Sequence, residues 1–195
     1  RQVRALCALH CANNLLQGPR FSEEAFREAA AALDSLERDL TEGRGLDYGN
    51  ARDDGSFNVQ VMEAVLKAAG FTMNSVQGRD GGMDAKADLA AEVAFILNKA
   101  EHWFALRRIA REWFDFNSCL QRPVHHTHDT LRELVSEAVH LGYSIFVVRG
   151  RFPRCPLEEE PRKLQDAVRG CGGPDQGFSS FACEGQLLGK DSSGT

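Results

Sequence analysis

The chain has 195 residues, 43% of them hydrophobic, and a formal net charge of −5. This length is enough for one domain with its own hydrophobic core. An acidic balance without a basic stripe argues against nucleic acid as a partner. The sequence also contains no run of about eighteen apolar residues, so we expect no membrane-spanning helix. Because the chain opens on Arg1 rather than a methionine and shows no signal-peptide pattern, we expect a processed chain or a fragment.

Six cysteines are scattered along the chain without a repeated Cys-x-x-Cys pair. A domain with a core of this size does not need disulfides for stability. We therefore expect reduced thiols and a cytoplasmic or nuclear protein.

The first part of the chain shows helical periodicity. Apolar residues at a spacing of three to four predict a helix over residues 4–17, ended by Gly18 in a left-handed cap. A second helical stripe follows Ser22, which is a good N-cap residue. We predict a break in this stripe at residues 34–35, which would fold it into a helical hairpin. A third helix is predicted over residues 58–70, with an asparagine cap at its start and glycine at its end.

From residue 71 onward the pattern changes to short apolar and aromatic runs that are typical of strands. The predicted strands are residues 71–76, 93–98, 102–109, 112–118 and 143–150. An amphipathic helix is predicted over residues 129–141, before the last of these strands. Helices first and strands later, joined by short connections, indicate an α+β fold in which a helical subdomain packs on a mainly antiparallel sheet.

The domain organisation follows from where this pattern ends. Residues 1–155 read as one domain. Residues 156–195 start with a segment that can hold a short helix and continue as a Gly/Ser-rich stretch, so we predict a flexible tail there.

A metal site is the first chemistry to consider. Cys7, His10 and Cys11 share one helix face, but tetrahedral zinc needs three or four ligands and no second pair has ligand spacing. The other histidine cluster, His125, His126 and His128, is interpreted as a polar surface loop. We therefore expect no metal.

The two cysteines of this helix differ in position. Cys11 lies one turn inside the helix and is predicted to be buried packing. Cys7 lies near the helix N-terminus, where the backbone N–H groups and the macrodipole lower a thiol pKa from about 8.5 into the range of about 3.5–7.5. A thiolate at that position is a nucleophile if a base is available.

The candidate base is His102, which opens a predicted strand. If residues 108–111 form a four-residue connection, Arg107 pairs with Glu112 and His102 lies opposite Asn117. The Asn117 amide oxygen could then accept a hydrogen bond from the ring and fix its tautomer. A shorter connection would shift this register by one or two residues. The residues alone leave a second interpretation open, in which His102 is a surface histidine beside an aromatic patch.

Gln2 is the fourth candidate residue. A glutamine amide just ahead of a nucleophile helix can donate a hydrogen bond to a developing oxyanion, together with the backbone N–H of Cys7. The alternative is a solvated terminal side chain.

The chain resembles the Josephin domain family in four stretches that occur in the family's order: QVRALCALHCANNLLQG, VQVMEAVLKAAG, EHWFALRRIAREWFDFNS and GYSIFVVRG. The resemblance covers residues 1–150. It implies a papain-like cysteine protease fold with a projecting helical hairpin at residues 22–43. It also implies a deubiquitinase that needs no metal or organic cofactor and whose partners are ubiquitin, polyubiquitin and ubiquitinated proteins.

Carried over position by position, the resemblance gives each candidate residue a role. Cys7 matches the nucleophile, His102 the general base, Asn117 the residue that orients the base, and Gln2 the oxyanion glutamine. Two alternatives remain at this point. One is a ubiquitin-binding module without catalysis, and the other is a papain-like enzyme that acts on a different ubiquitin-like tail.

Overall fold

The computed structural model describes residues 6–40, 57–76, 89, 91–100 and 102–171. Its centre is a six-stranded sheet in which every neighbouring pair of strands is antiparallel. In spatial order the strands are β1 (Thr72–Ser75), β6 (Ser144–Arg149), β2 (Ala94–Lys99), β3 (His102–Ile109), β4 (Glu112–Phe116) and β5 (Val124–His126).

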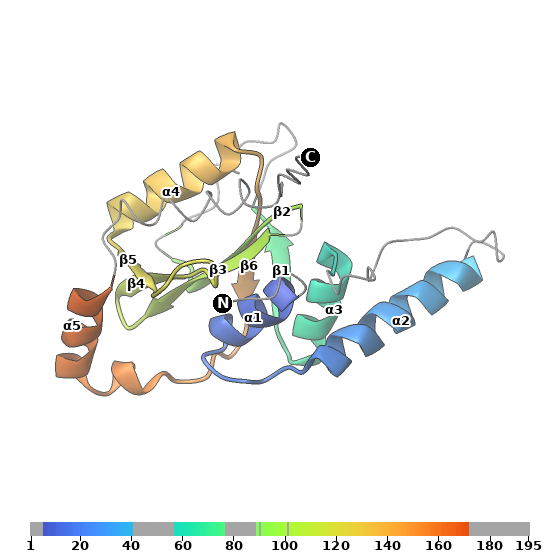
Figure 1. The fold of residues 1–195 in the computed structure, drawn as a ribbon, viewed down its shortest axis with the longest axis horizontal. Helices are drawn as coiled ribbons and strands as arrows, with labels where there is room; N and C mark the ends of the chain where they lie inside the picture. The colour runs from blue at the N-terminus through green and yellow to red at the C-terminus, as the bar shows by residue number, and fades with distance from the viewer. Residues whose placement is uncertain (1–5, 41–56, 77–88, 90, 101, 172–195) are drawn as a thin grey trace, which may run out of the picture.

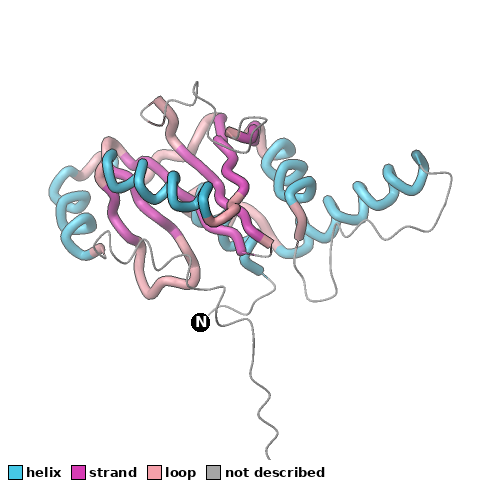
Figure 2. The backbone as a smooth tube through the Cα atoms, turned by 90° about the horizontal axis from the view of Figure 1, so that it is seen from above, coloured by secondary structure: helices cyan, strands magenta, loops and turns pink. Residues whose placement is uncertain are grey.

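Helices cover both faces of the sheet (Figure 1). They are α1 (Cys7–Leu15), α2 (Glu23–Leu40), α3 (Val59–Ala68), α4 (His128–His140) and α5 (Pro161–Gly170), with a short 3₁₀ turn, η2, at Pro156–Glu158. Figure 2 shows α4 lying across one face of the sheet while α2 extends away from the body. Within the described part of the chain, no helix is long and apolar enough to cross a membrane.

Two apolar clusters sit on the two faces of the sheet. Ile96, Trp103 and Ala105 pack with α1, α2 and α3 on one face. Phe95 and Phe104 belong to the cluster beneath α4 on the other. Because both faces are covered, successive residues of β2 and β3 are buried, which is why these strands read as continuous apolar runs. The predicted α+β fold, helices packed on an antiparallel sheet, is confirmed.

The helix caps were largely predictable. The Ser22 hydroxyl accepts from the N–H of Ala25 at 3.2 Å, and the Asn58 side chain accepts from Val61 at 3.0 Å. The predicted break at residues 34–35 is wrong, because α2 runs through it without interruption. An aspartate and a serine cost a helix interior only a few tenths of a kcal/mol each, which does not interrupt a helix of 18 residues.

The end of α1 also differs from the prediction. Gln17, at φ 54°, adopts the left-handed conformation that we expected of Gly18. The Asn13 side chain explains the difference, since its oxygen accepts from the N–H groups of Arg20 and Phe21 at 2.8 and 2.9 Å. This clamp fixes the connection from α1 to α2.

The β3–β4 hairpin has a shorter turn than predicted. Ile109 pairs with Glu112, so only two residues connect the strands, and Arg107 lies opposite Phe114 rather than Glu112. The predicted register is therefore wrong by two residues. Because the side chains of a strand alternate, an even shift leaves each side chain on the face that was expected.

The histidine cluster at residues 125–128 is not the surface loop that we predicted. His125 and His126 belong to the edge strand β5, and His128 begins α4. His126 is only 1% exposed. A strand of three residues is too short to show a two-residue alternation in the sequence, which is why it was missed.

Residues 151–171 continue along the sheet. Leu164 and Val168 of α5 pack against a cluster formed by Ile109, Phe114 and Cys155. The helix expected in this segment is present. The boundary at residue 155 between a domain and a tail stays a prediction, and residues 172–195 lie outside the described residues.

Candidate active site

His102 is buried at the start of β3. It is 5% exposed, and its ring packs against those of Phe104 and Tyr143, at centroid distances of 5.5 and 6.3 Å. Its Nε2 atom lies 3.3 Å from Nδ2 of Asn117, and its Nδ1 atom lies 4.0 Å from Sγ of Cys119. The alternative of a surface histidine is therefore wrong. The ring presents one nitrogen to an amide and the other to a thiol.

Asn117 follows the last residue of β4 and is 4% exposed. The contact between His102 and Asn117 is confirmed, but it is made diagonally across the hairpin, because the strand pairing has shifted by two residues. The atoms also differ from the expectation. The amide nitrogen of Asn117 faces the ring, since its oxygen accepts from the backbone N–H of Cys119 at 2.9 Å.

Asn98, near the end of β2, holds the main chain of His102. Its Nδ2 donates to the carbonyl oxygens of Ala100 and His102 at 3.2 and 3.3 Å. These bonds close the turn in which Lys99 pairs with His102. The backbone that carries the imidazole is thus fixed from the neighbouring strand.

Cys7 is the first residue of α1 and is half-buried. The first turn of α1 contains no acidic side chain, and Leu6 provides no side-chain cap. Among the described residues, no acidic side chain of this first turn offsets the positive end of the helix dipole, which favours a negative charge at Cys7. The helix packs on β3, the strand that carries His102.

Cys11 behaves as the predicted packing residue. It is 2% exposed, and burial raises its pKa well above the usual value, with Cys7 and Asp115 nearby acting in the same direction. A neutral thiol follows. His10, in contrast, is exposed on the outer side of the helix.

Two hydrogen bonds attach α1 to the sheet. The Asn14 side chain donates to the carbonyl of Phe116 at 3.5 Å, one residue before Asn117. Arg107 of β3, 1% exposed, donates to the carbonyl of Leu15 at 2.7 Å. The helix that carries Cys7 is therefore held both to the strand that begins with His102 and to the strand that leads to Asn117.

Arg107 also reaches the chain after β6. It donates to the carbonyl of Pro153 at 2.6 Å, and its guanidinium carbon lies 5.1 Å from the centre of the Phe152 ring. Burial lowers the Arg107 pKa, while Glu158 and Cys155 act in the opposite direction. An arginine remains charged at neutral pH, so a buried cation joins three segments.

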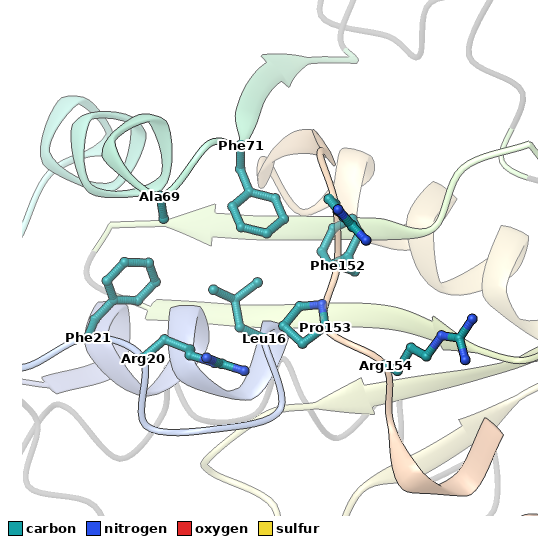
Figure 3. Close-up of a pocket in the computed structure, with 9 residues that line it drawn as sticks. Leu16, Arg20, Phe21, Ala69, Phe71, Phe152, Pro153 and Arg154 are labelled. Carbon is teal, nitrogen blue, oxygen red and sulfur yellow. The ribbon is translucent and has the colours of Figure 1, made fainter. Parts of the chain in front are cut away.

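A hollow of about 730 Å³ lies where α1 ends. Figure 3 shows Phe71 and Phe152 side by side in it, with Arg20 and Arg154 near Pro153. Cys7 lies at the opposite end of α1, which at 1.5 Å per residue is about 13 Å long. This hollow is therefore a surface distinct from the candidate site.

The predicted site residues thus have different outcomes. The structure brings His102 and Asn117 into contact. Cys7 begins α1, the helix that packs on β3, and β3 is the strand that starts with His102. Gln2 lies outside the described residues, so its oxyanion role stays a prediction. Sequence reasoning missed Asn98 and Cys119. In the sequence, Cys119 could have been noticed because it lies two residues after Asn117. Nothing in the sequence distinguishes Asn98 except its place before a turn.

Within the described ranges, no group of three or more His, Cys, Asp or Glu side chains is arranged to hold a metal ion.

An antiparallel sheet with a cysteine-bearing helix on one face and a buried His–Asn pair at its strand ends defines the papain-like cysteine protease fold. The model of the Josephin family matches residues 2–149, and the chain belongs to that family.

Relatives agree with this assignment. The chain is 36% identical over 173 residues to ataxin-3 of Rattus norvegicus, covering 82% of the chain and 48% of the relative. It is 34% identical over 177 residues to a putative ataxin-3 homolog of Oryza sativa subsp. japonica, covering 82% and 52%. An ataxin-3 homolog of Caenorhabditis briggsae is 33% identical over 174 residues, covering 83% and 54%. The chain therefore spans about half the length of the curated relatives it matches.

Proposed function

We propose that this chain is a thiol-dependent deubiquitinase that hydrolyses isopeptide or peptide bonds after the C-terminal glycine of ubiquitin. The observation that carries the proposal is the buried His102 ring held against Asn117, on a strand that packs beneath the helix beginning at Cys7. Membership of the Josephin family supports the choice of ubiquitin. A cytoplasmic or nuclear location remains a prediction from the sequence.

The reaction divides into acylation and hydrolysis. His102 takes the proton from the Cys7 thiol, and the thiolate attacks the carbonyl carbon of the terminal glycine. Collapse of the tetrahedral intermediate leaves a thioester on Cys7, while His102 protonates the departing lysine amine. Water, deprotonated by His102, then cleaves the thioester. The Cys7 N–H and Gln2 are the proposed donors to the oxyanion.

The two ring nitrogens of His102 have different neighbours. Nε2 faces the amide nitrogen of Asn117, which can only donate, so the neutral ring in this arrangement carries its proton on Nδ1, beside Sγ of Cys119. For Nδ1 to accept the Cys7 proton, the ring must carry its own proton on Nε2. A half-turn of the Asn117 amide would then present its oxygen to the Nε2–H, at the cost of the bond from the Cys119 N–H. Asn117 is in this way suited to orient the ring in either charge state.

A ubiquitin derivative with a C-terminal electrophile tests the assignment. We expect a single covalent adduct, mapped to Cys7 by mass spectrometry and absent from Cys7→Ala. Cys171→Ala is the matched control, because this cysteine lies beyond α5 and should leave labelling unchanged. An adduct that survives Cys7→Ala would overturn the assignment.

The same experiment separates the alternatives. Ubiquitin binding without adduct formation would identify a binding module rather than an enzyme. Labelling only by electrophiles built on other ubiquitin-like tails would identify a protease of different specificity.

A further inference from the structure

Three side chains form a row across the outer strands of the sheet. Arg108 of β3 lies opposite Trp113 of β4, and Trp113 lies opposite His126 of β5. Directly paired residues point to the same face, so a cation, an indole and an imidazole are neighbours on the α4 side of the sheet. The guanidinium carbon of Arg108 lies 5.8 Å from the centre of the Trp113 ring.

His126 is the unusual member of this row. It is 1% exposed, and neither of its ring nitrogens has a hydrogen-bond partner among the described residues. Burial lowers its pKa to about 4, and the neighbouring His125 acts in the same direction, so the ring is neutral at pH 7. A buried polar group left without a partner costs about 1–3 kcal/mol. Such a group points to a ligand that completes its hydrogen bonds.

His126 lines a hollow of about 590 Å³. The other lining residues are Arg108, Ala110, Arg111, Glu112, Trp113, Thr127 and His128. They come from the β3–β4 turn and from the start of α4, whose N-terminal dipole charge is partly offset by Asp129 in its first turn. Arginine side chains, a buried ring and a helix N-terminus therefore meet in one place.

The carboxylate of Glu112 is directed elsewhere. Glu112 precedes Trp113 on β4 and so points to the other face of the sheet, where its oxygen lies 2.6 Å from Nε2 of His125. Glu112 is the one carboxylate among the residues that line the hollow, and it is hydrogen-bonded to that histidine. On the side of His126 the lining is cationic and polar.

We propose that this hollow binds an oxyanion group, a phosphate or a carboxylate. Arg108 and Arg111 supply the opposite charge, the His126 ring supplies one N–H, and the first turn of α4 faces the same space. The Trp113 ring forms an apolar wall beside the anion.

The site is separate from the proposed active site. His102 begins β3 and Arg108 lies near the end of that strand, a separation on the order of 20 Å for an extended chain. Anion binding in this hollow therefore does not depend on hydrolase activity.

The test uses the whole chain and follows the imidazole resonances by NMR during titration with inorganic phosphate or acetate at constant ionic strength and pH 7. The His126 signal is assigned from its absence in His126→Leu. We expect this signal to shift saturably. Stronger binding of phosphate would indicate a phosphoryl ligand, and stronger binding of acetate a carboxylate. A His126 signal unchanged by both anions would overturn the proposal.

Arg111→Ala and Arg132→Ala provide the matched pair of variants. Arg111 lines the hollow, whereas Arg132 is an exposed arginine of α4 that does not. Loss of one charge-assisted hydrogen bond should weaken binding about tenfold in Arg111→Ala. Arg132→Ala should bind as the wild type does. Equal weakening in both variants would show a nonspecific charge effect and would also overturn the proposal.

Discussion

Two histidines, His102 and His126, are buried to almost the same degree, at 5% and 1% exposure, yet the surroundings of their ring nitrogens differ. Both nitrogens of His102 have polar neighbours, the amide of Asn117 and the thiol of Cys119. The nitrogens of His126 have no hydrogen-bond partner in the described part of the chain. Burial alone therefore does not distinguish a catalytic imidazole, whereas the groups that face its two nitrogens do.

A buried imidazole can affect either the activity or the stability of the protein. A ring with fixed partners has a set orientation, which proton transfer requires. A ring without partners stays neutral as pH falls and makes folding less favourable in acid. We therefore expect changes at His102 to appear mainly in activity, and changes at His126 to appear in stability and in anion binding.

The largest effect is expected for His102→Ala. Loss of the proposed general base should lower kcat/KM for a fluorogenic ubiquitin substrate by about a thousandfold. His140→Ala, which alters an exposed histidine at the end of α4, is the control and should retain activity. If His102→Ala kept activity within about twofold of wild type while folded, the role of base would have to move to another residue.

The acid stability of the protein tests the other half of the comparison. The pKa of His126 is lowered from 6.5 to about 4 in the folded state, so below pH 6.5 the unfolded chain takes up a proton that the folded chain does not. The free energy of unfolding should therefore fall as pH decreases, by about 2 kcal/mol between pH 7 and pH 5 from this group.

Urea unfolding of the wild type and of His126→Leu at these two pH values measures that contribution. The variant should lose about 2 kcal/mol less than the wild type on acidification. His140→Leu, which replaces an exposed histidine at the end of α4, is the control for the exchange of a histidine for a leucine. Parallel pH profiles for the wild type and His126→Leu would contradict the prediction.

Asn117→Ala should have a smaller effect than His102→Ala. The variant keeps the base but loses the amide beside Nε2, a hydrogen bond worth about 1 kcal/mol, so we expect kcat to fall about tenfold. Asn117→Gln, which keeps an amide on a longer side chain, should recover part of the loss. Wild-type kcat in Asn117→Ala would show that the observed contact does not serve catalysis.

The smallest effect is expected for Asn98→Ala. Two hydrogen bonds to the turn before His102 would be lost, so the free energy of unfolding should fall by about 1 kcal/mol. Thermal unfolding measures this change, and activity should fall only as far as the position of His102 does. A loss of activity as large as that of Asn117→Ala, with unchanged stability, would assign Asn98 a direct part in the reaction.

How far the sequence predicts this molecule depends on how local each signal is. Ser22 and Asn58 could be recognised as caps because capping is decided within four residues. The alternation of β3 and β4 placed His102 and Asn117 on one face, and an even register error preserved that result. The family resemblance supplied the roles of these residues.

The remaining errors have physical causes. The β3–β4 turn is Ala110-Arg111, with Ala110 at φ 56°. It lacks the Asn-Gly or Asp-Gly pair that is typical of a two-residue hairpin turn. The burial of His126 depends on strand pairing with Trp113 and on the helix that follows, and neither is visible in the residues around it. Long-range packing decided both features.

The contacts of Arg107 also bear on where the chain can be shortened for expression. The family match ends at residue 149, but one of the two carbonyl groups that accept hydrogen bonds from the Arg107 guanidinium belongs to Pro153. Truncation at the family boundary would keep all six strands and still leave a buried donor unsatisfied at the end of the helix that begins with Cys7. A chain that extends through Gly170 retains this acceptor and the packing of α5, and is the shorter form that we expect to fold as the whole chain does.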